Sequence, residues 1–396
     1  MVGGAETFAA TQEALGIAVA TRTPVFLWGE PGVGKTSIVQ QTVKAYRDAN
    51  GWDEQSYPFV TLIASVHDPA DFGGFPSPDR EAEMVRRLPV DWAVKVAGRT
   101  ALVFFDEFSS ATPAIQAACL RVLEEKVVGP LDLGSRVSFV LAGNPDTSGT
   151  AVWEFPPAVS RRFVHLDWAP DADYLIQGFL AGFPEVRMPR LAEIPVGEEP
   201  LGGYTRLRRT LSYDPEAIGV VTGFLAANRQ AVIDVPRDAG STGRGWPNPA
   251  TWERVMLLLT ACRQAGAGDL TRDLLITGSV GVGTGSEFLH YLAFDDLPAT
   301  EELLADPAGF DFTDVSGDKV YVVLGSVVAA VVADNTADRW RAAWTVVGNA
   351  ARDYSVGKAA LAARVLAMNR PVDDRDPRPP PEVELFIPML RASGLI

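Results

Sequence analysis

The chain has 396 residues, and its 47% of hydrophobic and 21% of charged residues are the composition of a soluble globular protein of two or three domains. A membrane span is excluded, because no apolar run reaches the roughly 18 residues that a spanning helix needs. The net charge of −15 disfavours a general electrostatic attraction to nucleic acid, although it leaves room for a local basic patch.

The first residues, Met1–Thr11, lack the basic region and the long apolar run of a secretory signal. The two cysteines, Cys119 and Cys262, lie in apolar helical patterns and are expected to be reduced core residues. Their spacing indicates neither a disulfide framework nor a zinc site, and the three histidines are scattered along the chain. We therefore expect a cytoplasmic protein without a histidine-built metal site.

The first half of the chain alternates short apolar runs with amphipathic stretches, a pattern typical of a parallel sheet flanked by helices. Five apolar runs are predicted to be buried strands: Pro24–Trp28, Phe59–Ala64, Ala101–Phe105, Val137–Leu141 and Phe163–Leu166. Helical spacing of apolar residues occurs between them, at Lys35–Arg47 and Pro113–Glu124. The expected fold class is α/β, a three-layer αβα core with a parallel five-stranded sheet over residues 1–190.

The second half of the chain is predicted to be helical. A stretch rich in Pro, Gly and Arg is expected to connect the core to an all-α lid domain, and the two together span residues 191–297. The apolar run Val322–Ala333 is predicted to be a buried helix. With further helices expected at Arg339–Val347 and Lys358–Asn369, residues 298–396 are predicted to form a helical C-terminal extension.

A glycine-rich segment after the first predicted strand fits the pattern G-x-x-x-x-G-K-[ST]: Gly29-Glu30-Pro31-Gly32-Val33-Gly34-Lys35-Thr36. It opens a helix that begins at Ser37, which is the setting that a phosphate-binding loop requires. Glycines let successive backbone N–H groups face the phosphates, and the helix N-terminus adds a favourable potential. Lys35 would reach the β- and γ-phosphates of ATP, and the Thr36 hydroxyl would bind Mg²⁺. Residues 29–37 are the predicted nucleotide-binding residues.

The third predicted strand is wholly apolar and ends in two acids, Asp106 and Glu107. A strand of this kind fits a central position in a parallel sheet, where ligands bind at the carboxyl ends of the strands. Asp106 would hold Mg²⁺, and Glu107 would orient and deprotonate the attacking water. The alternative is a helix N-cap followed by acids in the first helical turn.

The fourth predicted strand runs into Ala142-Gly143-Asn144-Pro145. Asn144 at the end of this strand is placed to hydrogen-bond the γ-phosphate and the catalytic water. The other interpretation is that Asn144 only builds the turn before Pro145, which is an ordinary use of Asn-Pro. Residue spacing alone leaves both interpretations open.

The order of these parts, followed by Pro157-Ala158-Val159-Ser160-Arg161-Arg162-Phe163, resembles an AAA+ ATPase and more narrowly the MoxR group. The resemblance implies that Asn144 is the sensor-1 residue. It also implies that Arg162 is the arginine finger, which reaches the γ-phosphate held by a neighbouring subunit of a homo-oligomer, with a hexamer as the implied ring size. Arg161 stands where the group more often has Asp or Asn, so either arginine is a candidate finger.

Two insertions resemble those of the MoxR and related clades. The segment Asp68–Pro76 resembles the helix-2 insert, whose loops face the ring pore, and Phe72 and Phe75 are its candidate substrate grips. The alternative is an ordinary loop that packs these rings on the domain. Residues 126–136 resemble the hairpin that precedes sensor 1 in the same clades.

The segment from Trp246 to Glu253 resembles the sensor-2 segment of the helical lid, in which an Arg commonly follows the second Pro. Here that position is Ala250, which puts a sensor-2 contact with the nucleotide in doubt. Arg254 and Arg244 are the two candidates to substitute for it.

The resemblance implies a Mg²⁺-dependent ATPase ring that remodels or activates a partner protein, with a von Willebrand factor A domain protein as the expected partner. Its implied catalytic residues are Lys35, Glu107, Asn144 and Arg162. Two alternatives stay open. One is a DNA-directed AAA+ motor, because related clades that share the helix-2 insert include replicative helicases, and the other is a non-catalytic ring scaffold that ATP orders.

Overall fold

A computed structural model of the chain describes residues 4–79, 81, 83–145, 153, 155, 157–183, 213–236, 243–292, 297–371 and 380–395. The chain forms two compact units. The first comprises Met1–Leu211 and Val235–Gly285, and the second comprises Ser212–Asp234 and Ser286–Ile396. Most of the predicted connection between core and lid lies outside the described residues.

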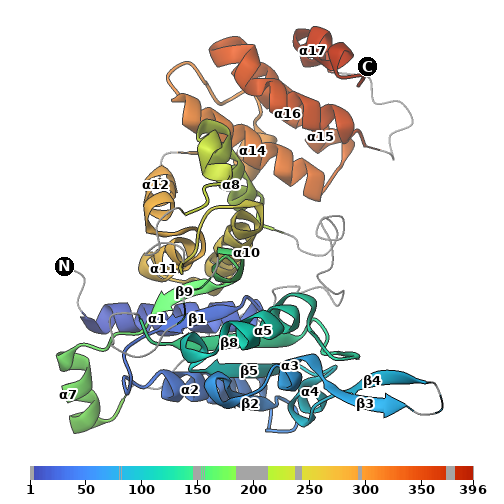
Figure 1. The fold of residues 1–396 in the computed structure, drawn as a ribbon. Coiled ribbons are helices and arrows are strands. Elements are labelled where there is room, and N and C mark those ends of the chain that lie inside the picture. Colours follow the sequence, from blue (N-terminus) through green and yellow to red (C-terminus); the bar gives the residue numbers. More distant parts are fainter. Residues whose placement is uncertain are drawn as a thin grey trace. The chain divides into compact units, whose positions relative to one another are not determined.

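The first unit contains a parallel five-stranded sheet, as predicted (Figure 1). Its strands are β1 (Val25–Trp28), β2 (Phe59–Ile63), β5 (Ala101–Asp106), β8 (Val137–Gly143) and β9 (Val164–Asp167). Their order in the sheet is β2-β5-β8-β1-β9. The strand β8 therefore lies between β1, which precedes the glycine-rich loop, and β5, which ends in the two acids. Both β5 and β8 are buried, apart from Asp106 at the end of β5, and they are mostly apolar because helices cover the two faces of the sheet.

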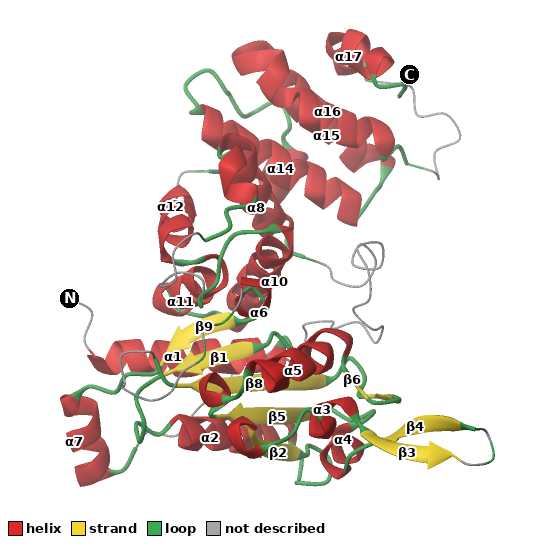
Figure 2. Cartoon of the chain, viewed as in Figure 1, coloured by secondary structure: helices red, strands yellow, loops and turns green. Residues whose placement is uncertain are grey.

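Helices and two small hairpins complete the first unit (Figure 2). The helices are α1 (Gly4–Ala20), α2 (Lys35–Asn50), α3 (Ala70–Gly73), α4 (Asp91–Val96), α5 (Pro113–Glu125), α6 (Pro157–Ser160), α7 (Ala172–Ala181), α10 (Pro249–Ala265) and α11 (Asp269–Val280). One antiparallel hairpin joins β3 (Phe75–Asp79) to β4 (Met84–Leu88), and the other joins β6 (Val127–Val128) to β7 (Leu131–Asp132). The second hairpin lies where the sequence predicted one.

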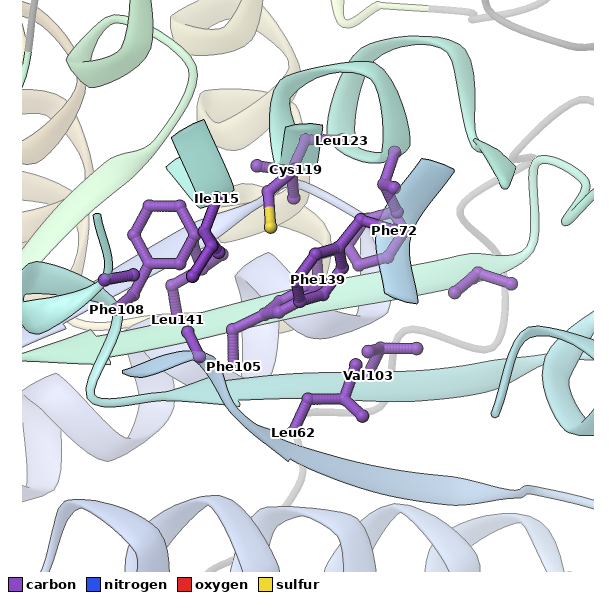
Figure 3. Close-up of a cluster of buried hydrophobic side chains, with 14 of the residues drawn as sticks. Leu62, Phe72, Val103, Phe105, Phe108, Ile115, Cys119, Leu123, Phe139 and Leu141 are labelled. Carbon is purple, nitrogen blue, oxygen red and sulfur yellow. The ribbon is translucent and has the colours of Figure 1, made fainter. Parts of the chain in front are cut away.

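Alternate residues of β5 enter two separate cores, as the period of a strand requires. Leu102 and Phe104 pack in the cluster that contains side chains of α1 and α2. Val103 and Phe105 pack in the opposite cluster, where Figure 3 shows Ile115, Cys119 and Leu123 of α5 pointing toward the strands. Cys119 and Cys262 are buried and unpaired, as expected.

The second unit is helical. Its helices are α8 (Pro215–Ala227), the C-terminal part of α12 (Val282–Leu292), α13 (Thr300–Ala305), α14 (Gly317–Ala333), α15 (Ala337–Ala350), α16 (Val356–Met368) and α17 (Ile387–Ala392). The predicted buried helix is α14. It packs closely against α8 because Gly219 has no side chain: a Cβ there would lie only 2.5 Å from the backbone nitrogen of Ser326. Sequence patterns grouped α8 with the lid, whereas its packing partner belongs to the C-terminal helices. Within the described residues, no helix has the length and apolarity to cross a membrane.

Candidate active site

The glycine-rich loop between β1 and α2 has the backbone that a phosphate-binding loop needs. Gly32 and Gly34 have φ angles of 80° and 90°, a left-handed region that other residues adopt at a cost. Gly29 has no room for a side chain, because a Cβ there would lie 2.4 Å from the carbonyl oxygen of Trp168. The indole N–H of Trp168 also donates to the carbonyl oxygen of Val33 at 3.0 Å. The loop is thus held by its own glycines and by the residue that follows β9.

Lys35 lies at the start of α2, and the residue as a whole is buried. Its Nζ donates to the carbonyl oxygens of Gly29 at 2.6 Å and Glu30 at 2.9 Å, and to Oδ1 of Asn144 at 2.9 Å. Burial lowers the pKa of Lys35, and the nearby carboxylates of Asp106 and Glu30 act in the opposite direction. The ammonium therefore points its hydrogens at three oxygens around the loop, which are the kind of acceptor that a phosphate supplies.

The two acids at the end of β5 meet the loop and the end of β2. The hydroxyl of Thr36 donates to Oδ2 of Asp106 at 2.7 Å. Oδ1 of the same carboxylate accepts the backbone N–H of Glu107 at 2.9 Å. Glu107 has a φ of 54°, an uncommon conformation for a residue with a side chain, and its Oε2 accepts the hydroxyl of Ser65 at 2.6 Å. Ser65 lies on a short 3₁₀ helix, Ala64–Val66, directly after β2.

Asn144 follows β8 and faces the loop through the contact of its side chain with Lys35. Its backbone N–H donates to the hydroxyl of Ser109 at 2.9 Å. The preceding residue is Gly143, where a Cβ would lie 2.7 Å from the same hydroxyl oxygen. This close packing fixes the end of β8, so the structure brings Asn144 together with Lys35.

The sequence assigned two residues to Mg²⁺, Thr36 and Asp106. Their hydroxyl and carboxylate oxygens lie side by side and are the kind of ligand that Mg²⁺ takes. Mg²⁺ usually takes one or two protein ligands and completes its octahedron with waters and substrate phosphates. No cluster of three or more His, Cys, Asp or Glu side chains suited to a metal occurs among the residues that the structure describes.

The two candidate arginine fingers lie between α6 and β9 and contact α5. Arg162 forms an ion pair with Glu124, and Nη2 of Arg161 lies 3.9 Å from the same carboxylate. Burial lowers the pKa of Arg162. Its Nε and Nη1 are buried and have no hydrogen-bond partner in the described part of the chain, so the guanidinium retains unused donors. No ion pair or hydrogen bond among those residues joins Arg162 to the phosphate-binding loop.

In the predicted sensor-2 segment, the position after the second Pro is exposed, and the two candidate substitutes for it make other contacts. Ala250 is exposed in the first turn of α10, which is capped by Asn248 and Thr251. Arg244 forms an ion pair with Asp167 at 2.9 Å, and its guanidinium lies 4.8 Å from the centre of the Trp28 ring. Arg254 donates to backbone carbonyl oxygens beside the candidate fingers.

One of the two candidate substrate grips is wrong. Phe72 is 1% exposed and packs with its ring centre 5.9 Å from that of Phe105 (Figure 3). The indole of Trp92 donates to the carbonyl oxygen of Asp71, which holds the short helix α3 against the core. Phe75 is 60% exposed at the start of the β3–β4 hairpin, so it remains available.

Sequence reasoning missed several residues of the site, namely Ser65, Ser109, Glu124 and Trp168. Each is an ordinary residue in its own segment and acquires its role only through a distant partner. Ser65 and Glu107, for example, are 42 residues apart. No local pattern distinguishes such a serine from a surface hydroxyl.

A match to a known protein family agrees with this geometry. Residues 24–163 match the family described as the AAA domain of the dynein-related subfamily. A solved structure of a candidate ATPase from Cytophaga hutchinsonii is 13% identical and covers 74% of this chain and 94% of its own, with a TM-score of 0.42. A search of curated proteins finds no match. Together with the parallel sheet and the phosphate-binding loop, the family match identifies an AAA+ P-loop fold, which implies nucleotide binding and ATP hydrolysis in general.

Proposed function

We propose that this chain is a Mg²⁺-dependent ATP hydrolase of the MoxR type, which works in the cytoplasm as a homo-oligomeric ring. One observation carries the proposal. The ends of β5 and β8 both meet the phosphate-binding loop, through the Thr36–Asp106 contact of 2.7 Å and the Lys35–Asn144 contact of 2.9 Å. These contacts join an ammonium, a hydroxyl, a carboxylate and an amide in one place, which is the donor and acceptor set that phosphoryl transfer requires.

The chain's own groups would divide the work as follows. Backbone N–H groups of the loop residues other than Pro31, which has none, would bind the β-phosphate, and Lys35 would exchange its carbonyl acceptors for phosphate oxygens. Thr36 and Asp106 would hold Mg²⁺, which would neutralise charge on the phosphates. Glu107 accepts the proton of the attacking water, and Asn144 orients that water or the γ-phosphate.

The site would be completed by a neighbouring subunit. Arg162 carries unused donors, and within its own chain it contacts Glu124 instead of the phosphate-binding loop. A guanidinium that reaches the γ-phosphate of the next subunit stabilises the charge of the transition state. Support for a ring comes from the AAA domain itself, and a hexamer is the ring size that we propose.

For the output of hydrolysis we propose the remodelling or activation of a partner protein, with a von Willebrand factor A domain protein as the expected partner. The exposed β3–β4 hairpin with Phe75 supports contact with a protein surface, and the net charge of −15 weighs against a DNA-directed motor.

A Glu107→Gln variant tests the enzyme and its client together. The substitution removes the base but keeps the size of the side chain, so the variant should bind ATP with unchanged affinity and lose turnover by about 1,000-fold or more. Purification of this ATP-bound form should retain a client protein that the Lys35→Ala variant, unable to hold ATP, does not retain. Normal biological function in Glu107→Gln would favour the scaffold, and retention of nucleic acid alone would favour the DNA motor.

A further inference from the structure

The side chain of Arg254 donates hydrogen bonds to the backbone of the segment that carries both candidate arginine fingers. Arg254 lies in the second turn of α10, a helix of the first unit that the sequence assigned to the lid. Its Nη1 donates to the carbonyl oxygens of Arg161 at 3.1 Å and Phe163 at 3.0 Å, and its Nη2 donates to that of Arg162 at 2.8 Å. One side chain therefore binds three consecutive peptide groups that are 91 to 93 residues away in sequence.

The electrostatic environment of Arg254 indicates that its side chain is stabilised mainly by these carbonyl groups. Burial, together with the charges of Arg161 and Arg162, lowers its pKa to about 10, so it stays charged at neutral pH. No carboxylate forms an ion pair with it in the described residues. A desolvated guanidinium beside two other cations needs compensating acceptors, and here the three carbonyls provide them through charge-assisted hydrogen bonds.

Neighbouring carbonyls of the same segment are held in the same way. The indole N–H of Trp246, just before α10, donates to the carbonyl oxygen of Pro157 at 3.0 Å. Nε2 of His165 lies 2.8 Å from the carbonyl oxygen of Ser160. Two of the three side chains that bind this segment, Trp246 and Arg254, thus come from the lid sequence.

We propose that Arg254 is a positioning residue, which fixes residues 161–163 so that the finger is presented to the nucleotide of the neighbouring subunit. The inference rests on the trans arginine finger of the proposed function. It assigns Arg254 to the neighbour's site and not to the nucleotide of its own subunit, which is the role that a substitute for sensor 2 would have. It also joins α10, which the sequence assigned to the lid, to the finger of the same subunit.

Mixed rings separate the two roles. Arg254→Gln subunits keep their own phosphate-binding loop and Glu107 but present a misplaced finger. Glu107→Gln subunits have an inactive site but an intact finger. We expect Arg254→Gln alone to bind ATP with a Kd within about twofold of wild type and to lose kcat about 10- to 100-fold, the order of loss that misplacement of a reacting group causes. An equimolar mixture of the two variants should recover about a quarter of the wild-type rate, because half of the sites keep Glu107 and half of these face an intact finger.

Arg162→Ala and Arg161→Ala, each mixed with Glu107→Gln, are the reference arms. If one of these mixtures recovers ATP hydrolysis, its arginine is the finger. Recovery of hydrolysis in the Arg254→Gln mixture then supports the inference. If an arginine finger variant recovers but Arg254→Gln does not, or if Arg254→Gln loses ATP affinity, Arg254 acts in its own site and the inference is wrong. If neither finger variant recovers, the trans finger of the proposed function fails and the inference fails with it.

Arg254→Lys is a second variant in case Arg254→Gln does not fold. It keeps the positive charge, but its single ammonium cannot reach all three carbonyls with the geometry of a guanidinium. We expect a melting temperature close to that of wild type, an intermediate kcat and recovery in mixed rings. A wild-type kcat in Arg254→Lys would mean that charge alone suffices and would overturn the positioning role.

Discussion

Lys35 and Asn144 are joined by a hydrogen bond of 2.9 Å across 109 residues of sequence. The bond exists because β1 and β8 are neighbours in the sheet, so the residues that follow them lie at the same edge. It ties the phosphate-binding loop to the end of the adjacent strand, and it decides in favour of a side chain that faces the loop, where the sequence had left Asn144 open as a simple turn residue.

Asn144→Ala should separate hydrolysis from binding. Loss of the amide removes one acceptor of Lys35 and the group proposed to orient the water, so we expect kcat to fall about 100-fold, as for removal of one catalytic hydrogen-bonding group. The Kd for ATP should change much less, because the backbone of the loop is unaffected. Steady-state kinetics and nucleotide titration measure the two quantities. An unchanged kcat would leave Asn144 as a residue of the turn before Pro145.

Thr36→Val should weaken the metal site while preserving the shape of α2. The variant lacks the hydroxyl that now donates to Asp106, so a ligand of Mg²⁺ is lost. We expect the Mg²⁺ concentration for half-maximal hydrolysis to rise about tenfold or more. Thr36→Ser, which keeps the hydroxyl, is the matched control and should retain the Mg²⁺ dependence of wild type. Equal behaviour of Val and Ser at this position would contradict a metal ligand.

Because Phe72 is buried and Phe75 is exposed, we expect their substitution by Ala to affect stability very differently. Phe72→Ala should destabilise the fold by about 3–5 kcal/mol, because Phe72 is buried against Phe105 and the variant leaves a cavity. Phe75→Ala should change the free energy of unfolding by less than about 0.5 kcal/mol, because Phe75 is exposed. Denaturant titration measures both. If Phe75 contacts a client, its variant should hydrolyse ATP normally and lose only the ATP-dependent retention of that client.

His165 should make the fold sensitive to mild acid. Its Nδ1 accepts the indole N–H of Trp28 at 2.9 Å, so its proton lies on Nε2, which donates to Ser160. Burial lowers its pKa from 6.5 to about 3.

Stability falls on acidification because the unfolded chain binds a proton at this histidine at a higher pH than the folded chain does. Between pH 6.5 and pH 3 the unfolded chain protonates this histidine and the folded chain does not, so the contribution of His165 to stability falls as the pH falls. Between pH 7 and pH 5 the loss should be about 2 kcal/mol. Thermal melts of wild type and His165→Asn at these two pH values measure it, with His290→Gln at an exposed position as the control for removal of a histidine. The prediction fails if His165→Asn loses as much stability on acidification as wild type.

Local features of the sequence determined the five strands, the phosphate-binding loop and the acids Asp106 and Glu107. Apolar runs and glycine spacing act within a few residues, so they indicate a strand or a loop wherever they occur, and the match of residues 24–163 agrees with them. The mixed outcome for Phe72 and Phe75 has the same origin, because local spacing placed both rings in an insert but carried no information about which one the core would cover.

Only the tertiary structure decided which distant side chains meet. The contact of Ser65 with Glu107 depends on β2 lying beside β5, and that of Arg254 with residues 161–163 depends on how α10 packs in the first unit. Hydrogen bonds form at about 3 Å whatever the distance along the chain, whereas sequence patterns report only on neighbours. The residue types of the site were therefore readable in advance, while the partners that hold them, and the connection of α10 to the finger, came from packing.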